Sequence, residues 1–354
     1  MHRKDNIGRA GDKMNKIALI SFNTCGTLGH MTLFNRIAHS LNKDHKVHLL
    51  SDYDLKINDL TPPLKIEHEL FDTGGEIRSN GGQISHKSSE QIFEYCKSKN
   101  INYALFSTFF DLDLVNNLRG IGIKSIYISY PLRDTYSELF FLRQHLSAFD
   151  EVVVFQDLYD NNYPESVKRS NPILIPFQKV ESNSAKILLT CGGGGRPSSV
   201  KFLELMEVYV PIMKDYGAEI VLIRGPNNKG IKIAGITSLE STNDLCQYID
   251  EARIVVSEAG YFTTHELISR SKPSILIPGE RRIDNQELRA IKYEERGFGY
   301  CVMPEESIDL LISRSLDLLI NQKRYGQMQV NCQKYHSLHN PEENIENILR
   351  GLLS

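Results

Sequence analysis

The chain has 354 residues, of which 41% are hydrophobic and 24% are charged, and its formal net charge is −3. At about 150 residues per domain this length predicts two domains, and the composition excludes a disordered, collagen-like or disulfide-scaffold protein. The near-neutral charge argues against nucleic acid as a partner, because phosphate binding needs a basic excess. The six cysteines form no C-x-x-C pair and match no zinc pattern, so we expect reduced thiols and a cytoplasmic location.

Residues 1–15 are polar and lack the apolar core of a signal peptide, so we expect a flexible N-terminal extension there. No run of about 18 apolar residues is present, and no transmembrane helix is therefore expected. An apolar run at 139–142 is flanked by Arg133 and Arg143. It leaves contact with a membrane surface open, although a buried helix face is the favoured interpretation.

The first half alternates short β-branched runs with helical periodicity. Each predicted strand is a short apolar run typical of strands buried on both faces, and these runs are residues 16–22, 47–51, 103–107, 125–129 and 151–155. A helix is predicted after Gly29, because Leu33, Phe34, Ile37, Ala38 and Leu41 are apolar at helical spacing. Strands that alternate with helices favour a parallel sheet with right-handed crossovers.

The same pattern restarts after a proline-bearing linker at 171–177 and a polar stretch at 178–185. Strands are predicted at 186–190, 219–224, 253–257 and 274–278, with helices at 198–214, 242–251, 263–271 and 285–296. The sequence thus predicts an α/β protein of two Rossmann-like parallel-sheet domains, 16–178 and 179–354, which face a central cleft. Such folds bind ligands at the carboxyl ends of their strands.

A glycine-containing turn follows the first predicted strand and ends at His30. Gly26, Thr27 and Gly29 belong to this turn, where glycine lets the backbone approach a ligand closely. The helix that follows offers free N–H groups to an anion, and His30 adds a group that titrates near neutral pH. A tight structural turn with a capping or packing histidine is the alternative.

A run of four glycines follows the strand predicted at 186–190. It consists of Gly192, Gly193, Gly194 and Gly195. Because Pro197 suits the first turn of a helix, the run predicts a site near phosphate at a helix N-terminus. The third glycine of the dinucleotide fingerprint is absent, and no Gly-Lys-Ser/Thr follows. These absences argue against NAD enzymes and P-loop NTPases.

Polar motifs follow the next two predicted strands. Glu266 comes after Gly260 and Thr263 in a predicted helix, where its carboxylate can accept both hydroxyls of a ribose. A solvent-exposed helix glutamate is the alternative. Asn285 and Gln286 stand at the start of the following helix. Their amides can bind sugar hydroxyls, and the arginines just before them can neutralise a diphosphate.

The order of these motifs resembles the donor-binding domain of GT-B glycosyltransferases of family 28. The resemblance covers about residues 186–304 and, in the first half, the glycine turn at 26–30. It implies that the glycine run, Gly260 and Thr263 contact the diphosphate of the donor. Glu266 would bind the ribose, and Asn285 and Gln286 would contact the donor sugar.

The resemblance implies transfer of a sugar from a nucleotide diphosphate donor, expected to be a UDP-sugar, to an acceptor that the sequence does not identify. The reaction is expected to need no metal and no cofactor and to invert the anomeric carbon. His30 is the first candidate for the base that takes the acceptor's proton. Asp111 is the second, with a helix cap as its alternative.

Several alternatives stay open. A nucleotide-sugar hydrolase or 2-epimerase would share this fold, and a partner subunit without catalysis would keep only the binding site. D-x-D patterns at 52–54 and 111–113 match metal-dependent GT-A transferases, although the two-domain repeat argues against that fold. An NAD oxidoreductase would need the complete glycine fingerprint.

Overall fold

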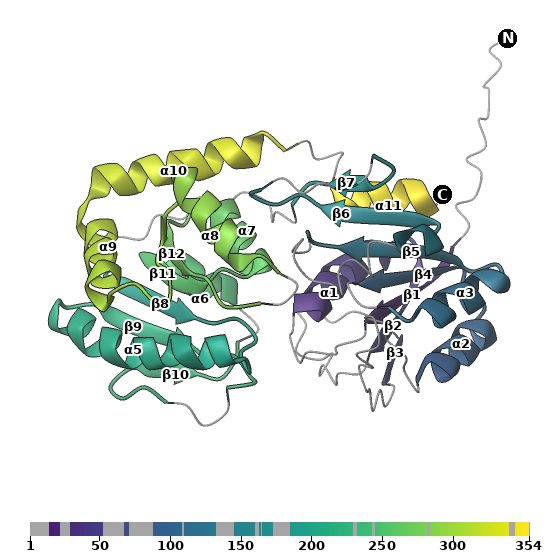
Figure 1. Ribbon diagram of the computed structural model, residues 1–354, viewed down its shortest axis with the longest axis horizontal. Coiled ribbons are helices and arrows are strands. Elements are labelled where there is room, and N and C mark those ends of the chain that lie inside the picture. The colour runs from purple at the N-terminus through teal and green to yellow at the C-terminus, as the bar shows by residue number, and fades with distance from the viewer. Residues whose placement is uncertain are drawn as a thin grey trace, which may run out of the picture.

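The structure, a computed structural model, describes residues 14–21, 29–51, 67–70, 88–107, 110–131, 145–159, 163, 165–172, 185–228, 232–242, 245–281, 284–339 and 344–353. The apolar run at 139–142 and most of the expected extension at 1–15 lie outside these residues. Two halves lie side by side, each built on a parallel sheet (Figure 1). Within the described ranges, no helix is long and apolar enough to cross a bilayer. The cytoplasmic location stays a prediction.

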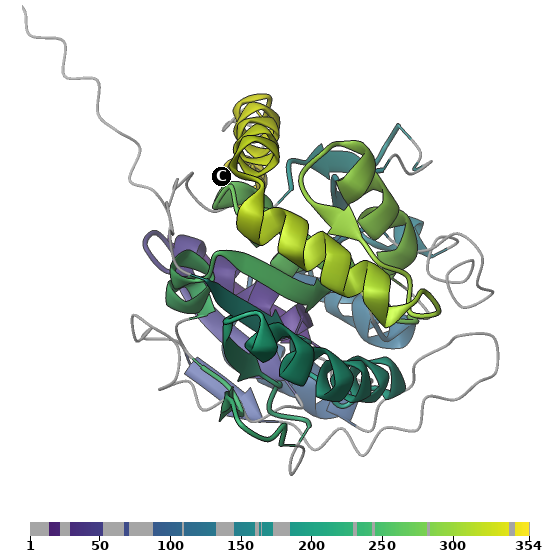
Figure 2. The same cartoon turned by 90° about the vertical axis from the view of Figure 1, so that its left-hand side faces the viewer.

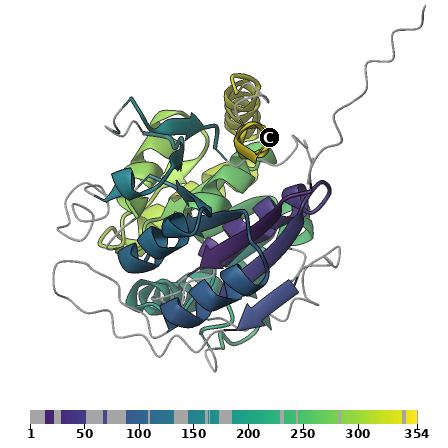
Figure 3. The same cartoon turned by 90° about the vertical axis from the view of Figure 1, so that its right-hand side faces the viewer.

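The N-terminal half contains a parallel sheet with the strand order β3-β2-β1-β4-β5-β6-β7. Its strands are β1 (Lys16–Ser21), β2 (Lys46–Ser51), β3 (Glu67–Leu70), β4 (Tyr103–Ser107), β5 (Lys124–Ser129), β6 (Glu151–Phe155) and β7 (Lys168–Ser170). Its helices are α1 (Gly29–Leu41), α2 (Ser88–Ser98), α3 (Leu112–Gly120) and the 3₁₀ turn η2 (Leu146–Ala148). Figure 3 shows α2 and α3 side by side on the outer side of this half.

The C-terminal half contains a second parallel sheet, ordered β10-β9-β8-β11-β12-β13. Its strands are β8 (Lys186–Thr190), β9 (Glu219–Ile223), β10 (Thr237–Leu239), β11 (Ile254–Glu258), β12 (Ser274–Ile277) and β13 (Tyr300–Cys301). Its helices are α5 (Pro197–Asp215), α6 (Leu245–Glu251), α7 (Tyr261–Ser269), α8 (Gln286–Glu295), α9 (Ile308–Ile320) and α10 (Gln322–Ser337). Figure 2 looks onto this half, with α5 and α9 toward the viewer.

The two-residue period of the strands explains why helices cover both faces of the second sheet. Ile187 and Leu189 of β8 pack with α5 and α9, whereas Leu188 packs with α7 and α8 on the other face. Ile254 and Val255 of β11 alternate in the same way. Strands that are apolar on both faces read as continuous hydrophobic runs, which is why the sequence predicted them well.

The last helix, α11 (Ile345–Leu353), packs with the N-terminal half although it ends the sequence. Ile345, Leu349 and Leu353 belong to the core cluster built on the first sheet. Figure 1 shows α10 along the top of the C-terminal half and α11 on the N-terminal half, where it packs with α1. The division between domains at residues 178 and 179 stays a prediction. α11 follows that division in the sequence but packs on the half that precedes it.

A buried ion pair joins the halves. Asp157, just after β6, lies 2.7 Å from Arg289 of α8 and 3.2 Å from His265 of α7, and all three side chains are fully buried. Burial alone would raise the pKa of Asp157, but Arg289 and His265 lower it to about 2. Asp284 pairs with the same guanidinium at 2.6 Å. Arg289 is thus held by a carboxylate from each half.

Candidate functional site

A cavity of about 350 Å³ lies at the carboxyl ends of β8 and β11 and is lined from both halves of the chain. We call it the nucleotide cavity, after the ligand that the sequence predicts for these residues. It brings together most of the residues that the sequence predicted for the donor site, namely Gly192, Gly193, Gly194, Gly260, Thr263, Glu266 and Gln286. These residues come from separate segments, and only the packing of the second sheet makes them neighbours. The predicted cleft between the two halves is therefore present.

Two glycines of the run, Gly194 and Gly195, are packed so tightly that side chains would not fit. Gly194 has φ +70°, and a Cβ there would lie 2.7 Å from Cγ of Asn228. Gly195 has φ +78°, its N–H donates to Asn228 Oδ1 at 2.8 Å, and this residue is not part of the cavity lining. The Asn228 amide also donates to Arg224 O at 2.7 Å. Asn228, in the turn after β9, therefore holds the glycine run in place. Nothing in the local sequence around Asn228 predicted this contact.

Gly194→Ala is expected to destabilise the fold by about 1–3 kcal/mol and to weaken binding of a nucleoside diphosphate, since the φ is left-handed and the Cβ would clash. Urea unfolding and calorimetry measure the two effects. Gly217→Ala is the matched control, because Gly217 has φ +82° with nothing within 4 Å of its Cβ position. Equal effects of the two variants on binding would contradict a role of the packed run in the site.

The N-terminus of α7 opens into the nucleotide cavity. Gly260 is the N-cap of this helix, and no side chain caps it. Thr264 N donates to Gly260 O, which leaves the N–H groups of the preceding turn without partners inside the helix. Thr263, in that turn, lines the cavity. The N–H groups of a first helical turn and the positive end of the helix dipole suit a phosphate.

Glu266 stands further along α7 and is buried, with 6% exposure. Its Oε1 accepts from Cys246 Sγ at 2.8 Å and lies 3.8 Å from Arg270 Nε. Burial, followed by the charge of Glu266, raises the pKa of Cys246 to about 12, so the thiol keeps its proton and donates it. Oε2 lies 3.9 Å from Arg36, beyond hydrogen-bond distance. This oxygen can accept ribose hydroxyls.

The two amide residues before and in α8 have different places. Asn285 is the N-cap of α8, and its Oδ1 accepts from Leu288 N at 3.2 Å. Its oxygen thus serves the helix, and the residue does not line the nucleotide cavity, so the structure does not support its predicted contact with the donor sugar. Gln286 lines the nucleotide cavity, and its Oε1 accepts from Gly279 N at 2.9 Å. Its amide nitrogen keeps two donors.

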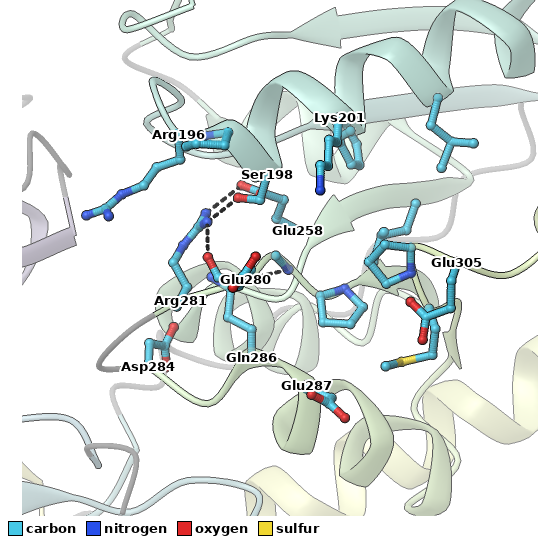
Figure 4. A pocket seen from close by; sticks show the side chains of 18 residues that line it. Arg196, Ser198, Lys201, Glu258, Glu280, Arg281, Asp284, Gln286, Glu287 and Glu305 are labelled. Atoms are coloured by element: carbon cyan, nitrogen blue, oxygen red, sulfur yellow. Dashed lines mark hydrogen bonds and ion pairs between the residues drawn. The ribbon is translucent and has the colours of Figure 1, made fainter. Parts of the chain in front are cut away.

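A second cavity, of about 920 Å³, adjoins the first and shares five lining residues with it. We call it the side cavity (Figure 4). The shared residues are Arg196, Glu258, Arg281, Asp284 and Gln286. Beyond them, the side cavity has an apolar wall of Phe202, Leu205, Ile277 and Met303 and charged groups at Lys201, Glu280, Glu287 and Glu305. Space beyond the nucleotide cavity is thus available for a further part of a ligand.

Glu258, at the end of β11, lies on the boundary of the two cavities and is 4% exposed. Its Oε2 accepts from Arg281 Nη2 at 3.0 Å and from Ser199 Oγ at 3.2 Å, and Arg281 also donates to Ser198 (Figure 4). Burial raises the pKa of the Glu258 carboxyl, against the opposing effect of Arg281. A Cβ at Gly279 would lie 2.6 Å from Oε1. The sequence analysis did not select Glu258. Its one local signal is that a charged residue ends an otherwise apolar strand.

The N-terminal half contributes Arg36 and Tyr130 to the lining of the nucleotide cavity, as far as the structure describes it. Tyr130 stacks on Tyr261 with ring centroids 5.7 Å apart. Neither side chain was predicted, because both reach the site from across the cleft. Gly26 and Thr27 lie outside the described residues. Gly29 and His30 begin α1, and the side chain of His30 lies outside the described part.

Asp111 is a helix cap, which corrects its prediction as a second catalytic base. It is 5% exposed and forms the N-cap of α3. Its Oδ1 accepts from Asp113 N at 2.9 Å and Leu114 N at 3.1 Å, and its Oδ2 accepts from Ser89 Oγ at 2.6 Å. Both oxygens are occupied by groups of the fold. Among the described residues, no three His, Cys, Asp or Glu side chains are placed to hold a metal ion.

Comparison with known proteins finds a family match within the C-terminal half. Residues 201–341 match the family described as "Glycosyltransferase family 28 C-terminal domain". A "UDP-N-acetylglucosamine--N-acetylmuramyl-(pentapeptide) pyrophosphoryl-undecaprenol N-acetylglucosamine transferase" from Thermosipho africanus is 25% identical over 223 residues, 58% of this chain and 65% of the relative. The protein of that name from Crocosphaera subtropica is 27% identical over 132 residues, 36% of this chain and 38% of the relative. The chain thus covers less than two thirds of either relative.

Solved structures resemble nearly the whole chain. MurG of Acinetobacter baumannii has a TM-score of 0.63 and 16% identity, covering 96% of this chain and 99% of that chain. The spinosyn forosaminyltransferase SpnP has a TM-score of 0.70 and 10% identity, covering 96% and 98%. These likenesses confirm the predicted GT-B fold of two α/β halves. The family match confirms the resemblance to family 28 in the C-terminal half.

Proposed function

We propose that this chain, whose residues 201–341 form a glycosyltransferase family 28 C-terminal domain, transfers a sugar from a nucleotide diphosphate donor to an acceptor. One observation carries the proposal: a single cavity gathers glycines 192–194, the N-terminus of α7, which no side chain caps, and the buried carboxylate of Glu266. These groups suit a diphosphate and a ribose. Residues 179–354 would bind the donor and residues 16–178 the acceptor, whose identity stays open.

The donor is proposed to be a UDP-sugar, because the names of the curated relatives contain UDP-N-acetylglucosamine. The nucleoside diphosphate would occupy the nucleotide cavity, with its ribose on Glu266 and a phosphate at the first turn of α7. Gln286 faces both cavities, so the sugar would lie beside it, toward the side cavity. The volume of that cavity leaves room for a substituted sugar.

The chemical problem is the negative charge that grows on the departing diphosphate. N–H groups at the start of α7 and the guanidinium of Arg281 are fixed at the cavity before the reaction, and prearranged donors stabilise such charge effectively. We propose that this replaces a metal ion. His30, at the start of α1, is proposed as the base that takes the acceptor's proton in one displacement with inversion. Wild-type turnover in His30→Gln would refute that role.

Thermal shift with UDP, and then with UDP-sugars, tests the binding part of this function, because a ligand of the folded state raises the melting temperature. Sugar transfer to candidate acceptors is then measured with and without EDTA, and we expect equal rates. Complete loss with EDTA would contradict the metal-independent mechanism. Release of free sugar without any acceptor would instead indicate a hydrolase, and a nucleotide-sugar epimer would indicate a 2-epimerase.

A further inference from the structure

Arg36 of α1 reaches the nucleotide cavity from the N-terminal half. Its Nη2 lies 3.9 Å from Glu266 Oε2, and its Cζ lies 5.7 Å from the ring centroid of Phe262. Phe262 is in the first turn of α7. The guanidinium therefore lies beside both the proposed ribose ligand and the helix end where a phosphate would bind.

The hydrogen-bonding capacity of Arg36 is largely unused. Its Nη1 is buried and has no hydrogen-bond partner among the described residues. The 3.9 Å approach of Nη2 to Glu266 is too long for a hydrogen bond. A guanidinium carries five N–H donors in a planar fork, and this fork matches the oxygens of a phosphate. The arginine therefore has donors available for an anion that enters the cavity.

The charge balance of the cavity favours the same conclusion. Arg281, which also lines the nucleotide cavity, is already paired with Glu258 at 3.0 Å. The rest of the described lining carries Arg36 and Arg196 as cations and Glu266 and Asp284 as carboxylates, so its charged groups balance. A diphosphate adds at least two negative charges, which favours a cation close to the start of α7. Arg36 lies in that place.

We propose that Arg36 is a diphosphate-binding residue supplied across the cleft by the N-terminal half, an inference that rests on the proposed function. When a nucleoside diphosphate binds, its ribose hydroxyls take Oε2 of Glu266, and the Arg36 guanidinium pairs with phosphate oxygens at the α7 N-terminus. Arg36 and His30 lie on the same helix, α1. Binding of the donor would thereby hold α1, which carries His30, against the C-terminal half.

The test compares UDP with uridine, which lacks the phosphates. Calorimetry is expected to show that Arg36→Ala weakens UDP binding about 10- to 100-fold, the range for a lost charged contact, and leaves uridine binding unchanged. Arg36→Lys keeps the charge without the fork and should lie between wild type and Arg36→Ala for UDP. Melting curves establish that the variants are folded.

Arg314→Ala is the matched control for Arg36→Ala. Arg314 of α9 pairs with Glu294 at 3.1 Å, and its side chain is 22% exposed, against 28% for Arg36. It does not line the nucleotide cavity, so its loss should change neither affinity. Equal weakening of UDP and uridine by Arg36→Ala, or unchanged or tighter UDP binding, overturns the proposal. A wild-type protein that binds no UDP contradicts the proposed function itself.

Discussion

Glu266→Ala is expected to weaken UDP binding about 10- to 100-fold. A carboxylate that accepts hydroxyl hydrogens contributes about 1.5–3 kcal/mol through charged hydrogen bonds. Glu266 is placed for this role, because Cys246 occupies its Oε1 at 2.8 Å, whereas among the described residues its Oε2 has the 3.9 Å contact with Arg36 and no hydrogen bond. Calorimetry with UDP measures the loss, and in turnover the same loss should appear as a raised donor KM.

A ligand without the 2′-hydroxyl separates ribose recognition from general damage to the cavity. Wild type should bind 2′-deoxy-UDP more weakly than UDP, whereas the Glu266→Ala variant should bind the two ligands alike. Glu266→Gln retains the size of the side chain and removes the charge, so it controls for the cavity left by alanine. If the alanine variant still prefers UDP over 2′-deoxy-UDP by the wild-type ratio, Glu266 does not read the ribose.

The sequence predicted the central strands because their signal is local. β4, β6 and β8 were predicted with the bounds that the structure shows, Tyr103–Ser107, Glu151–Phe155 and Lys186–Thr190. Each is a short apolar run, as expected for a strand covered on both faces. The edge strands β3 (Glu67–Leu70) and β10 (Thr237–Leu239) were missed. They are short and carry few apolar residues, so pairing with a neighbouring strand defines them.

The candidate site divides in the same way. The glycine run and Glu266 were found because turn geometry and motif order leave a local trace, and the structure brings both to one cavity. Arg36 and Glu258 were missed, since their importance depends on which distant segments pack against them. Asp111 was assigned to catalysis but caps a helix. The same residue type performs either task, and only the contacts of the side chain distinguish them.

Asp157→Asn is expected to destabilise the protein by about 3–5 kcal/mol, the usual effect of removing one partner of a buried ion pair. The Arg289 guanidinium donates to Asp157 Oδ2 from Nε at 2.9 Å and from Nη2 at 2.7 Å. Asparagine would leave part of that buried charge uncompensated between the two halves. Urea unfolding followed by circular dichroism measures the loss of stability.

The pKa of Asp157 sets the pH range in which this contribution exists. Because the pair lowers it from 3.8 to about 2, the stabilisation is fully present above the unfolded pKa and is lost as the pH falls toward 2. The difference in free energy of unfolding between wild type and Asp157→Asn should therefore be constant at neutral pH and shrink in acid.

Asp44→Asn is the control, since Asp44 lies 3.7 Å from Arg350 with both side chains about half exposed. That exposed pair should contribute less than about 1 kcal/mol. If Asp157→Asn lowered the free energy of unfolding no more than Asp44→Asn does, the buried pair would not be what stabilises the contact between the two halves.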